Sequence, residues 1–359
     1  MIQFLRYLLL PISLIYGLII IVRNYFYDTG LFKSQKFDLP VIVVGNLEVG
    51  GAGKSPMTEY LIQLLKPQHK IATLSRGYGR QTKGFFYADK NSTAETVGDE
   101  PAQFKQKFPD ITVAVCESRV AGVEKLQPEH DLILLDDAFQ HRALNPGFSI
   151  LLFDYGKLNG PHLLLPAGNY REPFSGKKRA DVIVISKCPS DLSVEKQQQI
   201  RSKMLLLPHQ NLFFTSIIYQ SFQSFFPSDD AVFINPKATL FLLTGIANPK
   251  PLLQHLRKQF AAVVQYKYPD HHQFTSKNIS KLAADFKACT VENKLILTTE
   301  KDAQRLQEPA LQKLLADVPV LIAPIGIAFL SEAEPDFKQL IENYVRKYQK
   351  NNRIYTKPD

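Results

Sequence analysis

Residues 41–56, with the sequence VIVVGNLEVGGAGKSP, constrain the fold of this chain more than any other segment. The β-branched run VIVVG follows Pro40 and is typical of a buried parallel strand, and a helix is predicted to begin at KSP. A glycine-rich loop between a strand and a helix is the context in which a Walker A motif binds phosphate. We therefore expect a P-loop domain of the α/β class.

The loop supplies groups that can hold a nucleoside triphosphate. Its glycines let backbone N–H groups turn inward on the β-phosphate, Lys54 can bridge the β- and γ-oxygens, and Ser55 can ligate Mg²⁺. Glu48 stands where the strict pattern has glycine, so the loop is a variant. The predicted nucleotide-binding residues are Gly50, Gly51, Ala52, Gly53, Lys54 and Ser55.

Further apolar runs follow along the chain, separated by segments long enough for helices. This alternation predicts a doubly wound, mostly parallel α/β sheet. The runs are ITVAV (111–115), LILLDD (132–137), SILLFD (149–154) and DVIVIS (181–186).

A chain of 359 residues exceeds what one hydrophobic core usually supports, so a second domain is expected. Near residues 205–235 the pattern changes to a Phe- and Ser-rich sequence that we interpret as an extended connector. Strand–loop–helix patterns then resume. The expected division is a membrane-associated helix (1–26), a P-loop core domain (27–215), a linker (216–235), a smaller α/β domain (236–330), and a C-terminal helix and tail (331–359).

The segment Tyr7–Val22 carries no charge and lies between Arg6 and Arg23. A helix needs about 20 apolar residues to span a bilayer, so both spanning and lying in the interface remain open for this run, which contains Pro11 and Gly17. A cleaved signal peptide is the competing interpretation, but the small-residue cleavage site is missing. A buried core helix is the third. We expect membrane attachment.

The net charge of +9 suits an anionic membrane surface, a phosphorylated substrate or a nucleic acid. Basic and aromatic residues do not interleave as in a nucleic-acid platform, so we expect no nucleic-acid partner. The three cysteines, Cys116, Cys188 and Cys289, are widely separated and odd in number, which favours buried thiols in a reducing compartment.

Two acidic pairs are candidates for catalysis. Asp136 and Asp137 end an apolar strand, where a Walker B carboxylate holds Mg²⁺, although a helix-capping pair is the alternative. Asp99 and Glu100 precede a predicted helix. Asp99 there is either an N-terminal cap or a base that accepts the proton of an attacking hydroxyl.

Histidine and arginine residues complete the candidate set. His271 lies in an Asp-His-His sequence without further zinc ligands at suitable spacing, so we expect it to orient or tune a carboxylate across a domain cleft. Arginines in short loops after strands are candidate phosphate clamps. They are Arg76, Arg80, Arg119, Arg142 and Arg171.

The form GGxGK[ST] also occurs in partition and insertion ATPases and in metallochaperone GTPases. Those ATPases usually carry lysine where this chain has Val49, and guanine readers usually end a later strand with Asn/Thr-Lys-x-Asp, whereas residues 186–189 are SKCP. ATP is therefore favoured over GTP. A partition- or metallochaperone-type ATPase acting as a nucleotide switch remains the alternative function.

Seven strings in order give a sharper match than the P-loop alone: GNLEVGGAGKSP, SRGYGR, VGDEP, LDDAFQHR, LPAGNYREP, PDHHQF and TEKDA. Together they resemble the tetraacyldisaccharide 4'-kinase (lipid A 4'-kinase) family of Gram-negative bacteria over nearly the whole chain. The resemblance implies ATP- and Mg²⁺-dependent phosphorylation of the 4'-hydroxyl of a tetraacyldisaccharide 1-phosphate, giving lipid IVA, on the cytoplasmic face of the inner membrane. No obligate protein partner is evident.

The resemblance also implies roles for individual residues. Asp99 matches the family's catalytic base and His271 its partner in an Asp–His dyad, which domain closure would bring together. Asp136 and Asp137 match the metal-side acids, with Glu100 as a neighbouring support. Arg171 matches a loop arginine near the site. Where the family usually has glycine after the two aspartates, this chain has Ala138.

Overall fold

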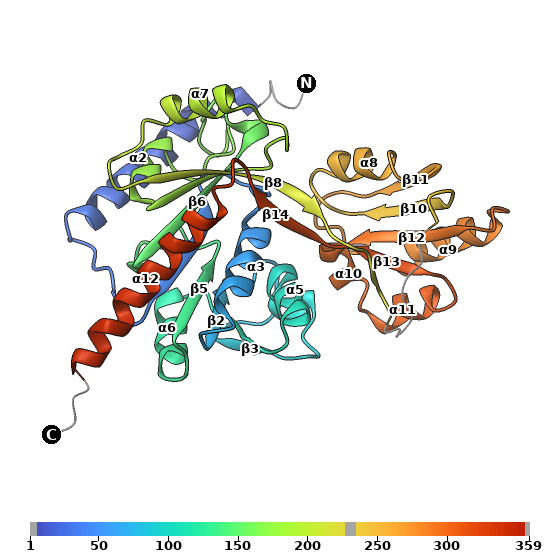
Figure 1. Cartoon of the computed structure of the whole chain (residues 1–359), viewed down its shortest axis with the longest axis horizontal. Helices are drawn as coiled ribbons and strands as arrows, with labels where there is room; N and C mark the ends of the chain where they lie inside the picture. Colours follow the sequence, from blue (N-terminus) through green and yellow to red (C-terminus); the bar gives the residue numbers. More distant parts are fainter. Residues whose placement is uncertain (1–5, 227–234, 356–359) are drawn as a thin grey trace.

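The computed structural model describes residues 6–226 and 235–355, and its strands form two sheets in two separate units (Figure 1). Three parts of predicted segments lie outside the described residues: 1–5 of the N-terminal helix, 227–234 of the linker and 356–359 of the C-terminal tail.

The larger sheet carries the phosphate loop. In the described part of the chain it has nine strands in the order β14-β8-β7-β6-β1-β5-β2-β4-β3, parallel except for the edge strands β3 and β14. The predicted doubly wound, mostly parallel sheet is therefore confirmed. The strands are β1 (Val41–Asn46), β2 (Ile71–Ser75), β3 (Phe86–Ala88), β4 (Thr112–Val115), β5 (Leu132–Asp136), β6 (Phe148–Asp154), β7 (Val182–Ser186), β8 (Asn211–Tyr219) and β14 (Ile325–Phe329).

Alternate side chains of its central strands enter two different hydrophobic clusters. Val41 and Val43 pack in one, and Ile42 and Val44 pack in the other, so both faces of the sheet are covered. The helices on this unit are α3 (Lys54–Leu65), α4 (Ala94–Val97), α5 (Asp99–Lys107), α6 (Arg119–Leu126), α7 (Val194–Met204) and α12 (Glu334–Tyr355), with short 3₁₀ turns at Gln127–Glu129, Tyr155–Lys157 and Phe174–Arg179.

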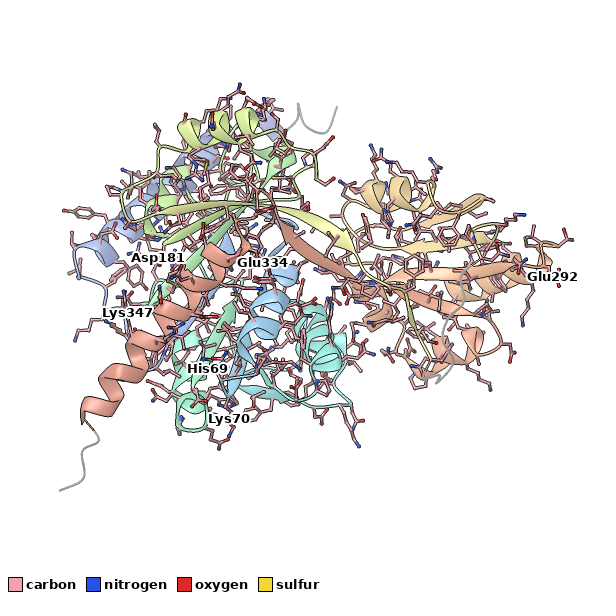
Figure 2. All side chains as sticks on the ribbon, in the orientation of Figure 1. His69, Lys70, Asp181, Glu292, Glu334 and Lys347 are labelled. Carbon is pink, nitrogen blue, oxygen red and sulfur yellow. The ribbon has the colours of Figure 1, made fainter. Side chains whose placement is uncertain are left out.

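The predicted C-terminal helix is present as α12 and packs back onto the larger sheet. Glu334 marks its first turn and Lys347 lies further along it (Figure 2). Tyr60 of α3 donates a hydrogen bond to Glu334 (2.9 Å), and the hydroxyl of Tyr344 bonds the backbone of Val41. These contacts fix the end of the chain against the strand that precedes the phosphate loop.

The second sheet has the strand order β11-β10-β12-β13-β9 within the described residues, parallel except for β9. Its strands are β9 (Gln223–Ser224), β10 (Thr239–Thr244), β11 (Ala262–Lys267), β12 (Lys294–Thr299) and β13 (Val320–Ala323). Its helices are α8 (Lys250–Leu256), α9 (Ser276–Ala288), α10 (Glu300–Arg305) and α11 (Pro309–Leu315).

Strands β8 and β14 pair antiparallel and carry the chain between the two sheets (Figure 1). The Phe- and Ser-rich segment, which we interpret from sequence as a connector, includes the strand β8. Its residues Leu212–Ser216 are all buried, so this part of the segment belongs to the core of the larger sheet. β14 is likewise a strand of the larger sheet although it lies within 236–330. We propose that the second unit ends near residue 324, between β13 and β14.

Helix α2 (Leu10–Asp28) lies on the outside of the P-loop unit (Figure 1). Among the described helices it alone is long and apolar enough to cross a membrane, and only 11% of that segment is buried. Its inward contacts include two polar ones: the Ser13 hydroxyl accepts from the N–H of Ala167 (2.9 Å), and the Tyr16 hydroxyl donates to the carbonyl of Arg171 (2.7 Å). Gly17 lets the helix approach the side chain of Leu164 closely. The apolar face points away from the protein.

Candidate active site

The phosphate loop joins β1 to α3 and is shaped by glycines with positive φ. Gly50 (φ 106°) and Gly53 (φ 84°) lie in a region that other residues rarely adopt. Two donors at the end of β7 fix the loop through its carbonyls: the Ser186 hydroxyl donates to Ala52 (2.7 Å), and the Lys187 ammonium to Gly51. With these carbonyls held from outside, the loop can present N–H groups to an anion.

Glu48, the departure from the strict loop pattern, is explained by a neighbouring segment. Its backbone forms an antiparallel bridge with Tyr170, and flanking hydrogen bonds join Val49 N to Asn169 O (2.8 Å) and Arg171 N to Leu47 O (2.7 Å). The side chain is 3% exposed, and burial raises its pKa although Lys157 lies nearby. A side chain is tolerated here because the loop's first part is extended.

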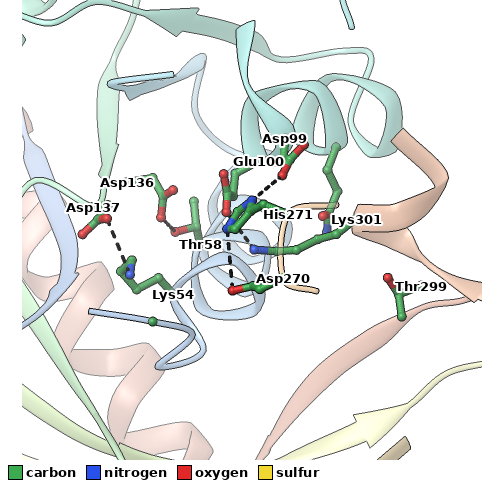
Figure 3. A network of polar contacts seen from close by, with 12 residues as sticks. Lys54, Thr58, Asp99, Glu100, Asp136, Asp137, Asp270, His271, Thr299 and Lys301 are labelled. Carbon is green, nitrogen blue, oxygen red and sulfur yellow. Dashed lines mark hydrogen bonds and ion pairs between the residues drawn. The ribbon is translucent and has the colours of Figure 1, made fainter. Parts of the chain in front are cut away.

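Asp136 and Asp137 lie together at the end of β5, facing the phosphate loop (Figure 3). Thr58 donates to Asp136 (3.1 Å), while Lys54 lies 3.6 Å and Arg171 2.9 Å from Asp137. Burial and then the neighbouring charge of Asp137 raise the pKa of Asp136 to about 7. Burial opposes ionisation of Asp137, but Lys54 and Arg171 outweigh it and lower its pKa. The pair therefore forms a site that favours an added cation.

Asp99 and His271 come from different units and are hydrogen-bonded (Figure 3). Nδ1 of His271 donates to Oδ2 of Asp99 over 2.9 Å, and the backbone of His271 has φ 57°, with its N–H bonded to the carbonyl of Gly245. Burial would raise the pKa of Asp99, yet the hydrogen bonds from His271 and Arg305 lower it to about 2. The hydrogen bond to Asp99 raises the pKa of His271.

Helix α10 contributes residues that sequence reasoning missed. Lys301 forms an ion pair with Glu100 (2.7 Å), and the Arg305 guanidinium binds Asp99. Lys107 of α5 also bridges Glu300 of α10 (2.6 Å). The sequence does place Glu300 and Lys301 at the start of a helix, because Thr-Glu-Lys-Asp follows a strand, but it gives no such signal for Arg305 at the helix end.

The other predicted arginines are placed unequally. Arg119 begins α6, is 4% exposed and bonds the carbonyl of Cys116 (3.1 Å); burial lowers its pKa to about 10. The charge of Arg119 helps to lower the pKa of Asp137. The charge of Arg76 in turn helps to lower the pKa of Arg119, so Arg76 lies near the same group. Arg142 instead pairs with Asp28 at the end of α2 (2.7 Å). Arg80 pairs with Glu117.

Glu172 is a further buried acid that the sequence did not single out. It is 2% exposed and accepts hydrogen bonds from Arg179 (2.8 Å), Gln140 (2.8 Å) and Asn24 of α2 (3.4 Å). It follows Arg171 directly, so it anchors the loop that carries Arg171 against α2.

The fold and these groups define a class: a P-loop protein with a carboxylate–imidazole pair formed between its two units. The sequence profile described as "Tetraacyldisaccharide-1-P 4'-kinase" matches residues 5–346, and the chain therefore belongs to that family of phosphotransferases. The expectation drawn from the sequence motifs is confirmed.

Individual members of this family are similar to the chain over nearly its whole length. The chain is 41% identical to the tetraacyldisaccharide 4'-kinase of Phocaeicola vulgatus, covering 96% of this chain and 97% of the relative. It is 42% identical to that of Bacteroides thetaiotaomicron, covering 96% and 94%. Among solved structures it is similar to LpxK from Aquifex aeolicus in complex with ATP, with a TM-score of 0.71 and 28% identity, covering 95% of this chain and 99% of that one.

Replacing Glu172 should destabilise the protein more than breaking an exposed ion pair. Glu172→Gln removes a buried carboxylate and leaves the partly exposed Arg179 guanidinium without its partner, so we expect a loss of about 2 kcal/mol in the free energy of unfolding. Asp110→Asn, which removes an exposed pair with Lys66, should cost less than about 1 kcal/mol. Urea unfolding measures both. Equal losses would show that Glu172 has no special structural role.

Proposed function

We propose that this protein transfers the γ-phosphoryl group of ATP to the 4'-hydroxyl of tetraacyldisaccharide 1-phosphate, giving lipid IVA in the biosynthesis of lipid A. The observation that carries this proposal is the contact between Asp99 and His271 across two units, next to a complete phosphate loop. The names of the relatives, and the ATP bound to the similar structure, support the acceptor and the nucleotide.

The phosphate loop would hold the triphosphate. Backbone N–H groups of residues 50–53 and the N-terminus of α3 supply donors and partial positive charge, and Lys54 lies on the same edge of the sheet. Arg171 approaches from the opposite loop and, with Arg119 and Arg76, adds charge for phosphoryl or lipid phosphate oxygens. Arg142 is assigned no part in this, because it pairs with Asp28.

Ser55, Asp136 and Asp137 fit a magnesium ion that arrives with the nucleotide. Within the described residues, no group of three or more His, Cys, Asp or Glu side chains could hold a metal. Mg²⁺ in kinases usually takes one or two carboxylates together with substrate phosphates, which matches this small donor set. Burial, and then the charges of Asp137 and Glu100, raise the pKa of Asp136, so a cation bound here would favour its ionised form. The ion would neutralise charge on the phosphoryl oxygens.

The oxygen of the 4'-hydroxyl would bond to the γ-phosphorus of ATP while Asp99 receives the hydroxyl proton. The bond between the γ-phosphorus and the β,γ-bridging oxygen breaks, and ADP leaves with that oxygen. With a pKa of about 2, Asp99 is ionised at neutral pH but is a weak base. A loose phosphoryl-transfer transition state needs little proton removal, so orienting the hydroxyl is the main task of Asp99. His271 holds the carboxylate in place.

The lipid acceptor explains helix α2. Exposed Leu14, Ile15, Leu18 and Ile19 form an apolar surface on α2, while Arg23 of the same helix suits anionic headgroups. We place the enzyme on the cytoplasmic face of the bacterial inner membrane, where ATP is available and free thiols such as Cys116 persist. A nucleotide switch is not favoured, because it would explain neither the apolar surface of α2 nor the Asp99–His271 pair.

Label from [γ-³²P]ATP should enter lipid when the protein is incubated with Mg²⁺ and tetraacyldisaccharide 1-phosphate in detergent. Thin-layer chromatography separates the product, and chemical analysis should find the new phosphate at the 4' position. Release of inorganic phosphate without lipid labelling would contradict the kinase proposal and favour a nucleotide switch. Lys54→Ala serves as the inactive control.

Asp99→Ala should lower kcat by about 10²–10⁴-fold, the usual contribution of a positioned proton acceptor, while ATP binding stays intact. Asp99 makes no hydrogen bond to the phosphate loop, so isothermal titration with ATP should give a Kd close to that of the wild type. The N-cap of α5 is Gly98 and no side chain caps that helix, so Asp99 does not have the capping role that its sequence position also allowed. Ser118→Ala, which removes the side-chain cap of α6, is the control for a purely structural loss. Parallel loss of transfer and ATP binding would contradict a role of Asp99 at the acceptor hydroxyl alone.

Ile15→Glu together with Ile19→Glu should reduce binding to phosphatidylethanolamine–phosphatidylglycerol vesicles about tenfold or more, since each exposed isoleucine loses apolar burial in the bilayer. Val194→Glu, on the equally exposed residue of α7, is the control. Vesicle flotation measures the bound fraction. Unchanged flotation of the double variant would remove α2 as the membrane contact.

A further inference from the structure

Arg305 is a charged residue for which neither the sequence motifs nor the proposed mechanism has a role. It is the last residue of α10 in the second unit, and its side chain has no exposed surface. An arginine this buried is uncommon unless its charge is matched by acids in fixed positions. Its partners therefore show what it does.

One edge of the guanidinium is held by the second unit itself. Nη1 donates to the carbonyl of Gly245 (3.0 Å) and to Oδ1 of Asp302 (3.0 Å). Asp302 is itself fixed by the hydroxyl of Thr299 (2.7 Å) and the N–H of Gly245 (3.0 Å). The guanidinium plane is therefore set before it meets the other unit.

The other edge forms a two-pronged contact with the catalytic carboxylate. Nε donates to Oδ1 of Asp99 (3.2 Å) and Nη2 donates to Oδ2, the oxygen that also accepts from His271. Such paired contacts fix the plane of a carboxylate as well as its position. A single hydrogen bond from His271 leaves the carboxylate free to rotate.

We propose that Arg305 is a positioning residue that fixes the plane of Asp99 and keeps it ionised whenever the two units are docked. This role of Arg305 rests on the proposed function, in which Asp99 receives the hydroxyl proton. Because Arg305 and His271 both belong to the second unit, docking delivers the imidazole and the guanidinium to Asp99 in one movement. The state of the base is then tied to the closure of the two units.

The charges around Asp99 predict the direction in which the pH profile shifts when Arg305 is removed. Hydrogen bonds and the charge of Arg305 lower the pKa of Asp99, and the same charge lowers the pKa of His271. Removing it should raise both, so the acid limb of the pH profile must move to higher pH. The other ionisable groups that act on this pair are Asp270, Glu100, Lys301 and Asp302.

The test compares pH profiles of kcat/KM for the lipid acceptor at saturating ATP. Arg305→Gln should lower kcat about 10²-fold and move the acid limb up by about one pH unit, with the KM for ATP unchanged. Arg305→Lys keeps the charge but not the two-pronged contact, so kcat should fall while the acid limb stays in place. Arg257→Gln, on the exposed surface of the same unit, should match the wild type.

A double-mutant cycle separates positioning from general structure. Arg305→Gln should add no further loss of kcat in an Asp99→Asn background, where the carboxylate that the guanidinium positions is absent. The contact between Arg305 and Asp302 is lost in both backgrounds, so its effect on kcat cancels in the cycle. A uniform loss at every pH, or an equal loss in both backgrounds, would overturn the proposal and leave Arg305 a docking contact. Wild-type activity in the variants would overturn it as well.

Three further outcomes of this test can be told apart. If Arg305→Gln does not fold, the same cycle with Arg305→Lys carries the test, and an equal loss with and without Asp99 overturns the proposal. If the wild type itself fails to label lipid, the proposed function fails. If the wild type labels lipid but the Arg305 variants keep its pH profile, only the inference about Arg305 fails.

Discussion

The hydrogen bond between Asp99 and His271 joins two separately folded sheets, and the arrangement of the site depends on it. Asp99 begins α5 on the P-loop unit, whereas His271 follows β11 in the second unit. Neither unit contains a complete pair. The geometry at the site is therefore a property of docking, and the antiparallel pair β8–β14, which connects the sheets, limits the directions in which the units can move.

The docked interface is unusually ionic for a contact between two cores. Lys107 contacts Glu59 of its own unit and Glu300 of the other at 2.6 Å each, and Lys301 reaches Glu100. Burying charges costs much of what their attraction returns, so such an interface adds little net stability but strongly favours one register. An apolar interface of the same size would tolerate sliding. Fixed charges at α5 and α10 suit a site in which the carboxylate of Asp99 has to be placed accurately.

Sequence reasoning reached the parts of this structure that are local. The run VIVVG and the loop after it identify β1 and the phosphate loop without other residues, and Asp136 lies at a strand end that hydropathy alone locates. Pairing Asp99 with His271 needed the family resemblance, because 172 residues separate them. Arg305 lies 206 residues from Asp99, and no local pattern distinguishes it from a solvated helix residue. β8 was missed because a strand buried on both faces lacks alternation.

Helix α2 is connected to the phosphate loop through one segment. Residues 163–172 receive hydrogen bonds from Arg6, which precedes α2, and from Tyr16 of α2, and the same segment pairs with the loop at Val49. A shift of α2 relative to the sheet would therefore move Arg171 and the backbone that carries Glu48 together. If the acceptor lies in a membrane, as proposed above, this segment gives the lipid acceptor and the nucleotide a common reference in the protein. The lipid surface and the triphosphate site are thus held in register by the protein backbone.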